Sequence, residues 1–331
     1  MPPMNDPRQL TPVPDTLVIP ERYCPLLQDV NPMRAQLDAS IEAWVQKFGL
    51  VRTEREWTLF HAAQTGLLTS LCYPRMPFET LEPAGHLCTW ILQFDESGFE
   101  GPASRGDFSQ TTANLARFQK IADAPQQPLD VQEPYWVALQ DILLRLHKVA
   151  TGEQLYRFDM GILRWLHGNG CELGYRVKGT MPTLQDFLVI RGNTAGSSLF
   201  ASMIDMGSDR PISSAHWGSP ALRALNLLGD FLYGIDNDIA SYLRDAQSPR
   251  QLRWNVVDVL AHEYGISAEH AIQRACDMHR EKMQQTADLC SSLRQHPDTG
   301  VREFATDFEY MMSGPWKWYQ MINRYRVVDE F

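Results

Sequence analysis

The chain has 331 residues, of which 44% are hydrophobic, and a formal net charge of −10 at pH 7. This length suits one large domain or two small ones, and the acidic balance argues against general nucleic-acid binding, although a local basic cluster would still bind a small anion. No window of about 18 uncharged apolar residues is present, so we expect no transmembrane helix and no membrane insertion.

The chain opens with a segment rich in proline, MPPMNDPRQLTPVPDTLVIP, which lacks the basic and then apolar pattern of a secretory signal. We interpret residues 1–28 as a flexible N-terminal arm. The six cysteines are scattered and form no CxxC pair. This usage predicts reduced thiols, a cytoplasmic location, and neither disulfides nor structural zinc.

Helical periodicity runs through the remainder of the chain, and no stretch alternates convincingly at period two. Turn residues separate the helical segments, for example YPRMP at 73–77 and KGTMP at 178–182. No repeat or linker divides residues 29–327, so we predict a single all-α domain, a helical bundle around a central apolar cavity. The expected helices are 33–48, 55–70, 79–97, 108–121, 132–149, 152–176, 183–206, 219–246, 250–264, 267–295 and 299–326.

The sequence NDIASYLRD at 237–245 carries a polar stripe. On a helix, Asn237, Ser241 and Asp245 lie within about 80° of one another. Their amide, hydroxyl and carboxylate oxygens are hard ligands of the kind that Mg²⁺ takes, and a substrate phosphate would complete the coordination. The alternative is an ordinary solvated polar face. The metal site is favoured because the stripe follows the apolar run ALNLLGDFLYGI and because Arg244 supplies a cation beside the acid.

A second group of acids ends the segment WILQFDESGFE at 90–100, where Asp95, Glu96 and Glu100 follow an apolar helix. Glu96 and Glu100 share a helical face, whereas Asp95 lies about 100° away from it. These acids would form the second half of a metal clamp. The alternative is an ordinary acidic last turn, although acids there oppose the helix dipole.

Two segments offer donors for an anion. In FLVIRGNTAGSSLF at 187–200, Arg191 lies among apolar and small residues, and a buried arginine needs either a carboxylate of the protein or a phosphate as its partner. In WKWYQMINRYR at 316–326, Arg324 and Tyr325 would donate hydrogen bonds to a phosphate oxygen.

Taken together, these motifs resemble those of a class I terpene synthase (terpene cyclase) of the bacterial type, over residues 30–326. NDIASYLRD resembles the NDxxSxxxE magnesium triad of that family, and FDESGFE resembles its aspartate-rich motif. Arg191 lies 46 residues before Asn237 and matches the pyrophosphate-sensor arginine. Thr194 and Ala195 then fall at the linker and effector positions of the helix-break motif.

The resemblance extends to three further features. Arg244 fits the basic residue before the third triad ligand, and Arg324-Tyr325 fits the C-terminal RY pair. DVNP at 29–32 resembles the N-terminal segment that folds over the closed site in this family.

Two departures from the family pattern concern the metal ligands. The third triad ligand is Asp245 instead of glutamate, and Phe99 stands where many members carry an acid. In the first motif, Asp95 is therefore the ligand that the resemblance supports most directly, ahead of Glu96 and Glu100.

The resemblance implies a class I terpenoid synthase-like bundle, three Mg²⁺ ions and an isoprenyl diphosphate substrate. Farnesyl diphosphate is the favoured substrate because of the chain length. The alternatives are a diterpene synthase that uses geranylgeranyl diphosphate, a chain-elongating prenyltransferase, and a non-catalytic helical binding protein. The oligomeric state stays open, because a homodimer is suggested by analogy with the fold alone.

An apolar pocket should lie below the metals, because aromatic faces stabilise cations without attacking them readily. Helix phase relative to the expected ligands selects its wall, although each of these residues would also suit a packed core. Trp90, Phe94 and Trp316 are interpreted as packing residues. The expected pocket residues are Cys88, Ile91, Leu92, Phe187, Tyr233, Trp318 and Met321.

Overall fold

The computed structural model describes residues 12–14, 17–94, 99, 101–104, 106–247 and 252–322. Within these ranges all regular structure is helical, which confirms the all-α prediction. No helix in the described part of the chain is long and apolar enough to cross a membrane. The helices are α1 (Arg34–Phe48), α2 (Glu54–Ala63), α3 (Thr65–Cys72), α4 (Phe78–Phe94), α5 (Gly101–Ser104), α6 (Phe108–Asp123), α7 (Pro134–Val149), α8 (Gly152–Lys178), α9 (Leu184–Thr194), α10 (Ser197–Met206), α11 (Ser214–Trp217), α12 (Pro220–Ala246), α13 (Val256–Tyr264), α14 (Ala268–Leu293) and α15 (Thr299–Met321).

Two expected helices are each divided in the structure. The helix expected over 55–70 breaks at Gln64, which takes a left-handed conformation with φ of 45° and joins α2 to α3. The helix expected over 183–206 breaks between Ala195 and Gly196, where Gly196 has φ of 75°. A left-handed residue cannot continue a right-handed helix, so each break redirects the chain. The short helices α5 and α11 lie in stretches between the expected helices.

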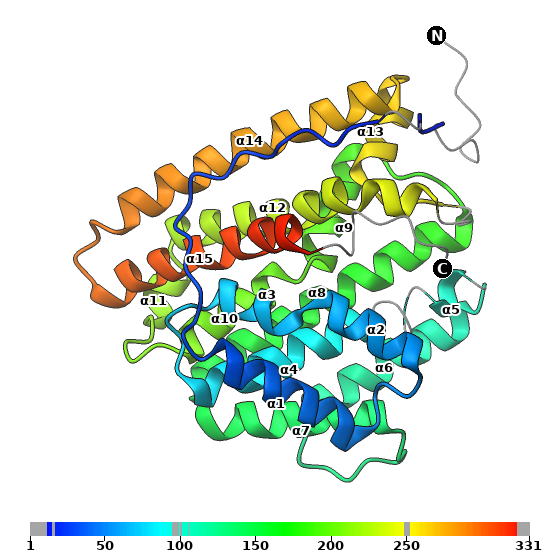
Figure 1. Ribbon diagram of the computed structural model, residues 1–331. Helices are drawn as coiled ribbons and strands as arrows, with labels where there is room; N and C mark the ends of the chain where they lie inside the picture. The colour runs from blue at the N-terminus through cyan, green and yellow to red at the C-terminus, as the bar shows by residue number, and fades with distance from the viewer. Residues whose placement is uncertain are drawn as a thin grey trace.

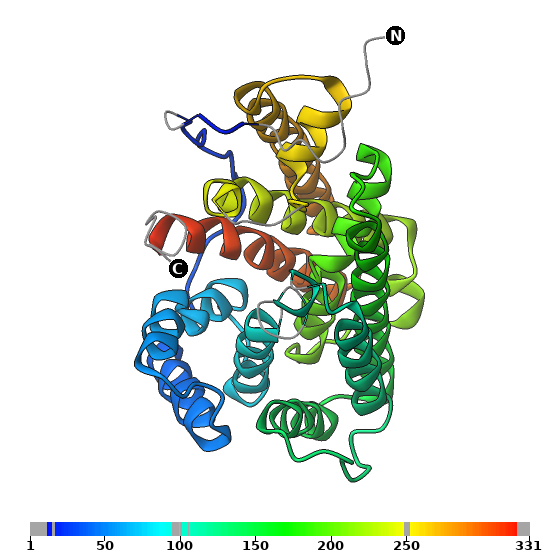
Figure 2. The same cartoon turned by 90° about the vertical axis from the view of Figure 1, so that its right-hand side faces the viewer.

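Helix α12 is the central element of the fold and packs against α9, α10, α13, α14 and α15. Figure 1 shows it beside α15 in the middle of the molecule, with α14 along one side, and Figure 2 shows the other helices arranged around this pair. Ser219 caps its first turn and Pro220 occupies its first position, as helix starts favour. The central helix therefore has a well-defined start, 17 residues before Asn237.

Two clusters of buried apolar side chains hold the helices together. The larger includes an aromatic group in which the Trp90 ring packs 4.9 Å from that of Phe94 and 5.2 Å from that of Phe118. The packing role assigned to Trp90 and Phe94 is confirmed, because neither side chain is exposed to solvent. The smaller cluster lies between α9, α12, α13 and α14.

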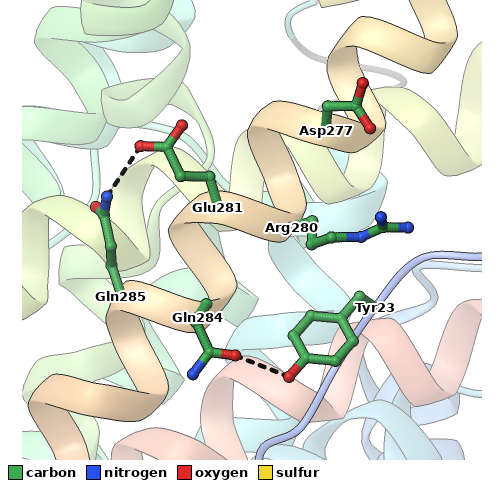
Figure 3. Close-up of a pocket in the computed structure, with 6 residues that line it drawn as sticks. All are labelled: Tyr23, Asp277, Arg280, Glu281, Gln284 and Gln285. Atoms are coloured by element: carbon green, nitrogen blue, oxygen red, sulfur yellow. Dashed lines mark hydrogen bonds between the residues drawn. The ribbon is translucent and has the colours of Figure 1, made fainter.

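From residue 17 to α1 the chain is extended, and it lies along α14 before it passes α15 towards α1 (Figure 1). Arg22 is its main anchor: the guanidinium forms an ion pair with Asp236 of α12 and donates to the backbone oxygen of that residue over 3.0 Å. Next to it, the Tyr23 hydroxyl donates to Gln284 of α14 over 2.8 Å (Figure 3). Ser313 of α15 donates to the Leu27 carbonyl. The described part of this arm is thus fastened to three helices.

Candidate active site

Helix α12 places the three predicted metal ligands on one face, as its periodicity requires. The Ser241 hydroxyl donates to Asp245 over 2.6 Å, so these two oxygens are already neighbours. Arg244 lies 3.2 Å from the other carboxylate oxygen of Asp245. Asn255, which caps α13, also donates to Asp245 over 3.3 Å. The carboxylate is therefore held by donors from two helices.

Arg191 reaches from α9 to the same face of α12. Its Nη2 donates to Oδ1 of Asn237 over 2.8 Å, and its Nε donates to Asp238 over 2.9 Å. Its Nη1 donates to the Thr194 hydroxyl over 3.2 Å. The structure thus brings the predicted sensor arginine together with the predicted linker and with the first residue of the triad.

Asp238 is the acidic partner that this arginine requires. Its side chain is buried, and its second oxygen accepts from the backbone N–H of Val256 over 2.9 Å. Burial raises the pKa of Asp238 to about 6, although Arg191 and the Val256 N–H both oppose this shift. Asp238 therefore holds Arg191 in place and is itself fixed from α13.

Two glycines allow α9 and α12 to approach closely. A Cβ atom on Gly234 would lie 2.9 Å from Cγ of Arg191, and one on Gly192 would lie 3.3 Å from Cβ of Asp230. Contacts this short require the neighbour to move. Gly234 therefore leaves the space in which the Arg191 side chain crosses α12.

The break between α9 and α10 carries Thr194 and Ala195, and it is fixed from two sides. The Ser198 hydroxyl donates to Asp230 of α12 over 2.8 Å. Arg164 of α8 donates to the other oxygen of Asp230 over 2.6 Å and also contacts Asn193. Asp230 thus anchors the start of α10, and Ala195 occupies the last position before the left-handed Gly196.

The donor set on α12 suits a hard divalent cation. It consists of one amide oxygen, one hydroxyl and one carboxylate, which are oxygen ligands typical of Mg²⁺. No group of three His, Cys, Asp or Glu side chains that would hold a metal occurs in the described ranges. The triad has a single carboxylate, so a phosphate ligand or acids from another segment would be needed to neutralise the cation.

Five predicted site residues, Asp95, Glu96, Glu100, Arg324 and Tyr325, lie outside the described residues. Helix α4 ends at Phe94, immediately before Asp95, and α15 ends at Met321. Their roles stay predictions from the sequence.

The expected pocket residues fall into different environments. Cys88, Tyr233 and Trp318 belong to or pack against the larger apolar cluster, as do Ile91 and Leu92. The Tyr233 hydroxyl lies 3.6 Å from the sulfur of Cys72, and burial raises the Tyr233 pKa well above its ordinary value.

Two other expected pocket residues lie elsewhere. Phe187 belongs to the smaller cluster, where its ring lies 5.2 Å from that of Trp254. The Met321 side chain is 49% exposed. The structure therefore gathers five of the expected pocket residues around one cluster and places Phe187 and Met321 apart from it.

Sequence reasoning missed three residues that hold the site. Asp238 lies within NDIASYLRD and would have been found by asking which acid neutralises Arg191. Nothing in the sequence indicated the roles of Asn255 and Tyr319, because they meet the triad only through tertiary packing. The Tyr319 hydroxyl accepts from Nδ2 of Asn237 over 2.7 Å.

A family model described as terpene synthase family 2, C-terminal metal binding, matches residues 86–285. The chain belongs to this family. The resemblance inferred from the motifs is thereby confirmed: the protein is a bacterial-type class I terpene synthase, and its relatives are terpene cyclases.

The relatives match nearly the whole chain. A germacradien-6-ol synthase from Streptomyces pratensis is 24% identical over 314 residues, which cover 94% of this chain and 87% of the relative. A 4-epi-cubebol synthase from Streptosporangium roseum, described as (2E,6E)-farnesyl diphosphate cyclizing, is 24% identical over 298 residues, 90% and 89% of the two chains. The crystal structure of the SVS_A2 protein from ancestral sequence reconstruction has the same fold, with a TM-score of 0.82, 24% identity, and coverage of 92% and 90%.

Proposed function

We propose that this terpene synthase ionises farnesyl diphosphate in a Mg²⁺-dependent reaction, cyclises the resulting allyl cation and releases diphosphate. The observation that carries the proposal is the contact of Arg191 with Asn237. A guanidinium suited to a diphosphate lies directly against a set of oxygen ligands suited to Mg²⁺. The description of a relative as a farnesyl diphosphate cyclase supports the choice of substrate.

The residues of this chain would divide the work between metal and anion. Asn237, Ser241 and Asp245 would hold Mg²⁺ on one side of the site, and Asp95, with Glu96 and Glu100, would hold it on the other. When bound, Mg²⁺ would stabilise the negative charge that develops on the diphosphate leaving group.

Arg191 and Arg244 would bind the diphosphate oxygens, together with Arg324 and Tyr325. The contacts of Arg191 with Asp238 and Thr194 would hold the guanidinium beside the metal site when its contact with Asn237 is shared with the metal or replaced by one with the diphosphate. No nucleophile of the protein is required for this reaction.

The carbon chain would lie against the apolar wall. The Trp318 ring is held by its N–H, which donates to the backbone oxygen of Ala63 over 2.9 Å. An aromatic face stabilises a nearby cation and does not readily react with it. Tyr233 and Cys88 would complete the wall, and exclusion of water would prevent premature capture of the cation.

We further propose three Mg²⁺ ions, as the family resemblance implies. The cytoplasmic location stays a prediction from the sequence, and the homodimer stays an analogy with the fold. Geranylgeranyl diphosphate is the alternative substrate.

The decisive experiment is incubation of the purified protein with Mg²⁺ and, separately, the C10, C15 and C20 diphosphates, followed by gas chromatography–mass spectrometry. A cyclic C15 terpene is expected, and Asn237→Ala should abolish it. Asn226→Ala, on the same helix, is the matched control and should retain activity. A C20 hydrocarbon would identify geranylgeranyl diphosphate as the substrate instead.

Two other outcomes would contradict the proposal. An elongated diphosphate formed in the presence of isopentenyl diphosphate would establish a prenyltransferase. The absence of both product and diphosphate release, without any thermal shift from Mg²⁺ and diphosphate, would indicate a helical binding protein.

A further inference from the structure

Both ends of the Asn237 amide are occupied in the structure. Arg191 carries only hydrogen-bond donors, so the atom that faces it must be the amide oxygen. The amide nitrogen then points to the Tyr319 hydroxyl of α15, which accepts its hydrogen bond over 2.7 Å. The two contacts together define which way the amide is turned.

The two contacts differ in their compatibility with a bound cation. A metal at the amide oxygen approaches the same atom as Arg191, which would have to share it or turn to the diphosphate. The Tyr319 contact uses the other end of the amide and leaves the oxygen accessible. It is therefore the contact that can persist when the site is loaded.

The ring of Tyr319 is in turn supported by the N-terminal arm. The Arg22 guanidinium lies 5.3 Å from the centre of this ring, within cation–π distance. Arg22 is fixed there by its ion pair with Asp236, the residue before Asn237. The backbone oxygen of Arg22 also accepts a hydrogen bond from the Trp316 indole N–H of α15 over 2.9 Å. The arm thus connects α12 and α15 at the point where Tyr319 meets Asn237.

We propose that Tyr319 is a positioning residue that keeps the Asn237 oxygen turned towards the metal, and that Arg22 acts through Tyr319. This inference rests on the proposed function, because it assigns Asn237 as a Mg²⁺ ligand. Partners that orient metal ligands typically contribute ten- to hundred-fold to metal affinity. Neither Tyr319 nor Arg22 is among the positions matched to the family motifs.

The test measures binding instead of turnover. The protein is titrated with Mg²⁺ at a fixed, saturating concentration of inorganic diphosphate, and the melting temperature is followed. Tyr319→Phe retains the ring and removes only the hydroxyl. We expect the Mg²⁺ concentration at half-maximal stabilisation to rise about tenfold. The melting temperature without ligands should stay close to that of the unsubstituted protein.

Tyr310→Phe is the matched control, because it removes the same atom from the same helix, nine residues earlier and near Arg75. Its Mg²⁺ titration should be unchanged. A simple loss of stability would lower the melting temperature of Tyr319→Phe without ligands and leave the Mg²⁺ midpoint unchanged, and this result would overturn the proposal.

Arg22→Lys tests the second part, since lysine keeps a positive charge near Asp236 and loses the planar group over the ring. We expect a two- to threefold rise in the Mg²⁺ midpoint, and no further rise when the substitution is combined with Tyr319→Phe. Additive effects would show that Arg22 does not act through Tyr319.

The outcomes separate this inference from the proposed function. An unchanged Mg²⁺ midpoint in Tyr319→Phe, beside a clear Mg²⁺-dependent shift in the unsubstituted protein, overturns the positioning role alone. If the unsubstituted protein shows no Mg²⁺-dependent shift with diphosphate, both proposals fail.

Discussion

Arg191 crosses α12 directly over Gly234, so that a Cβ atom on Gly234 would lie 2.9 Å from Cγ and 3.4 Å from the backbone oxygen of Arg191. Gly234→Ala should therefore push the guanidinium away from Asn237 and Asp238. We expect kcat/KM for the diphosphate substrate to fall at least tenfold, although alanine is the better helix former. Steady-state kinetics with the substrate identified by product analysis measure this change.

Gly170→Ala on α8 is the control for the glycine substitution, because a Cβ atom there meets nothing within 4 Å. It should leave kcat/KM unchanged and stabilise the fold by up to about 1 kcal/mol. Equal kinetics for the two variants would refute the steric argument.

Arg191 makes three directed contacts, with Asp238, Thr194 and Asn237. Arg191→Lys replaces the planar donor fork with a single ammonium, which cannot reproduce all three contacts. We expect at least a tenfold loss of kcat/KM with a folded protein. Arg34→Lys, in the exposed Arg34–Asp38 ion pair of α1, is the control and should stay within about twofold of full activity.

The Asp245 carboxylate is reached by three donors, from Ser241, Arg244 and Asn255. Asp245→Glu restores the residue typical of the family but moves the carboxylate by about 1.5 Å, the length of one carbon–carbon bond. It should therefore lose the Ser241 and Asn255 contacts, and activity should fall threefold or more. A variant as active as the unsubstituted protein would show that these donors do not set the geometry of the ligand.

His86 makes the fold sensitive to acid. Arg145 lies 2.5 Å from its Nδ1 atom, and burial, with this guanidinium, lowers the His86 pKa from 6.5 to about 3. In the unfolded chain, His86 binds a proton as the pH falls through 6.5. In the native state it does so only at about pH 3. The stability contributed by neutral His86 is thus fully present above pH 6.5 and is lost progressively below it. At pH 5 the loss is about 2 kcal/mol.

Urea unfolding at pH 7.5 and pH 5 would measure this effect. The difference in unfolding free energy between the two pH values should be about 2 kcal/mol smaller in His86→Gln than in the unsubstituted protein. His270→Gln, at an exposed position of α14, should retain the full difference. The same pH dependence in all three proteins would count against the role of His86.

The part of the site that lies within one helix was predictable from the sequence. Asn237, Ser241 and Asp245 share a face of α12 because a continuous helix fixes their relative directions. The position of Phe187 on its helix, one turn before Arg191, was a poor guide to whether Phe187 lines the pocket. The Arg191 side chain is long enough to reach across α12, whereas the Phe187 ring packs against Trp254.

Contacts between distant segments were beyond sequence reasoning. Nothing near Tyr319 or Asn255 in the sequence indicates that each binds a member of the triad, because only packing of α15 and α13 on α12 brings them there. The break at Gln64 was missed for a different reason: a left-handed glutamine carries no compositional signal, whereas Gly196 does.

The arm at the N-terminus has a consequence for the order of folding. Its contacts join residues 214 positions apart at Arg22 and Asp236, and 294 positions apart at Arg22 and Trp316. On the ribosome these partners emerge long after the arm does, and contacts that close such long loops form late. The arm is therefore among the last segments to reach its final position, although it is synthesised before the helices that it contacts.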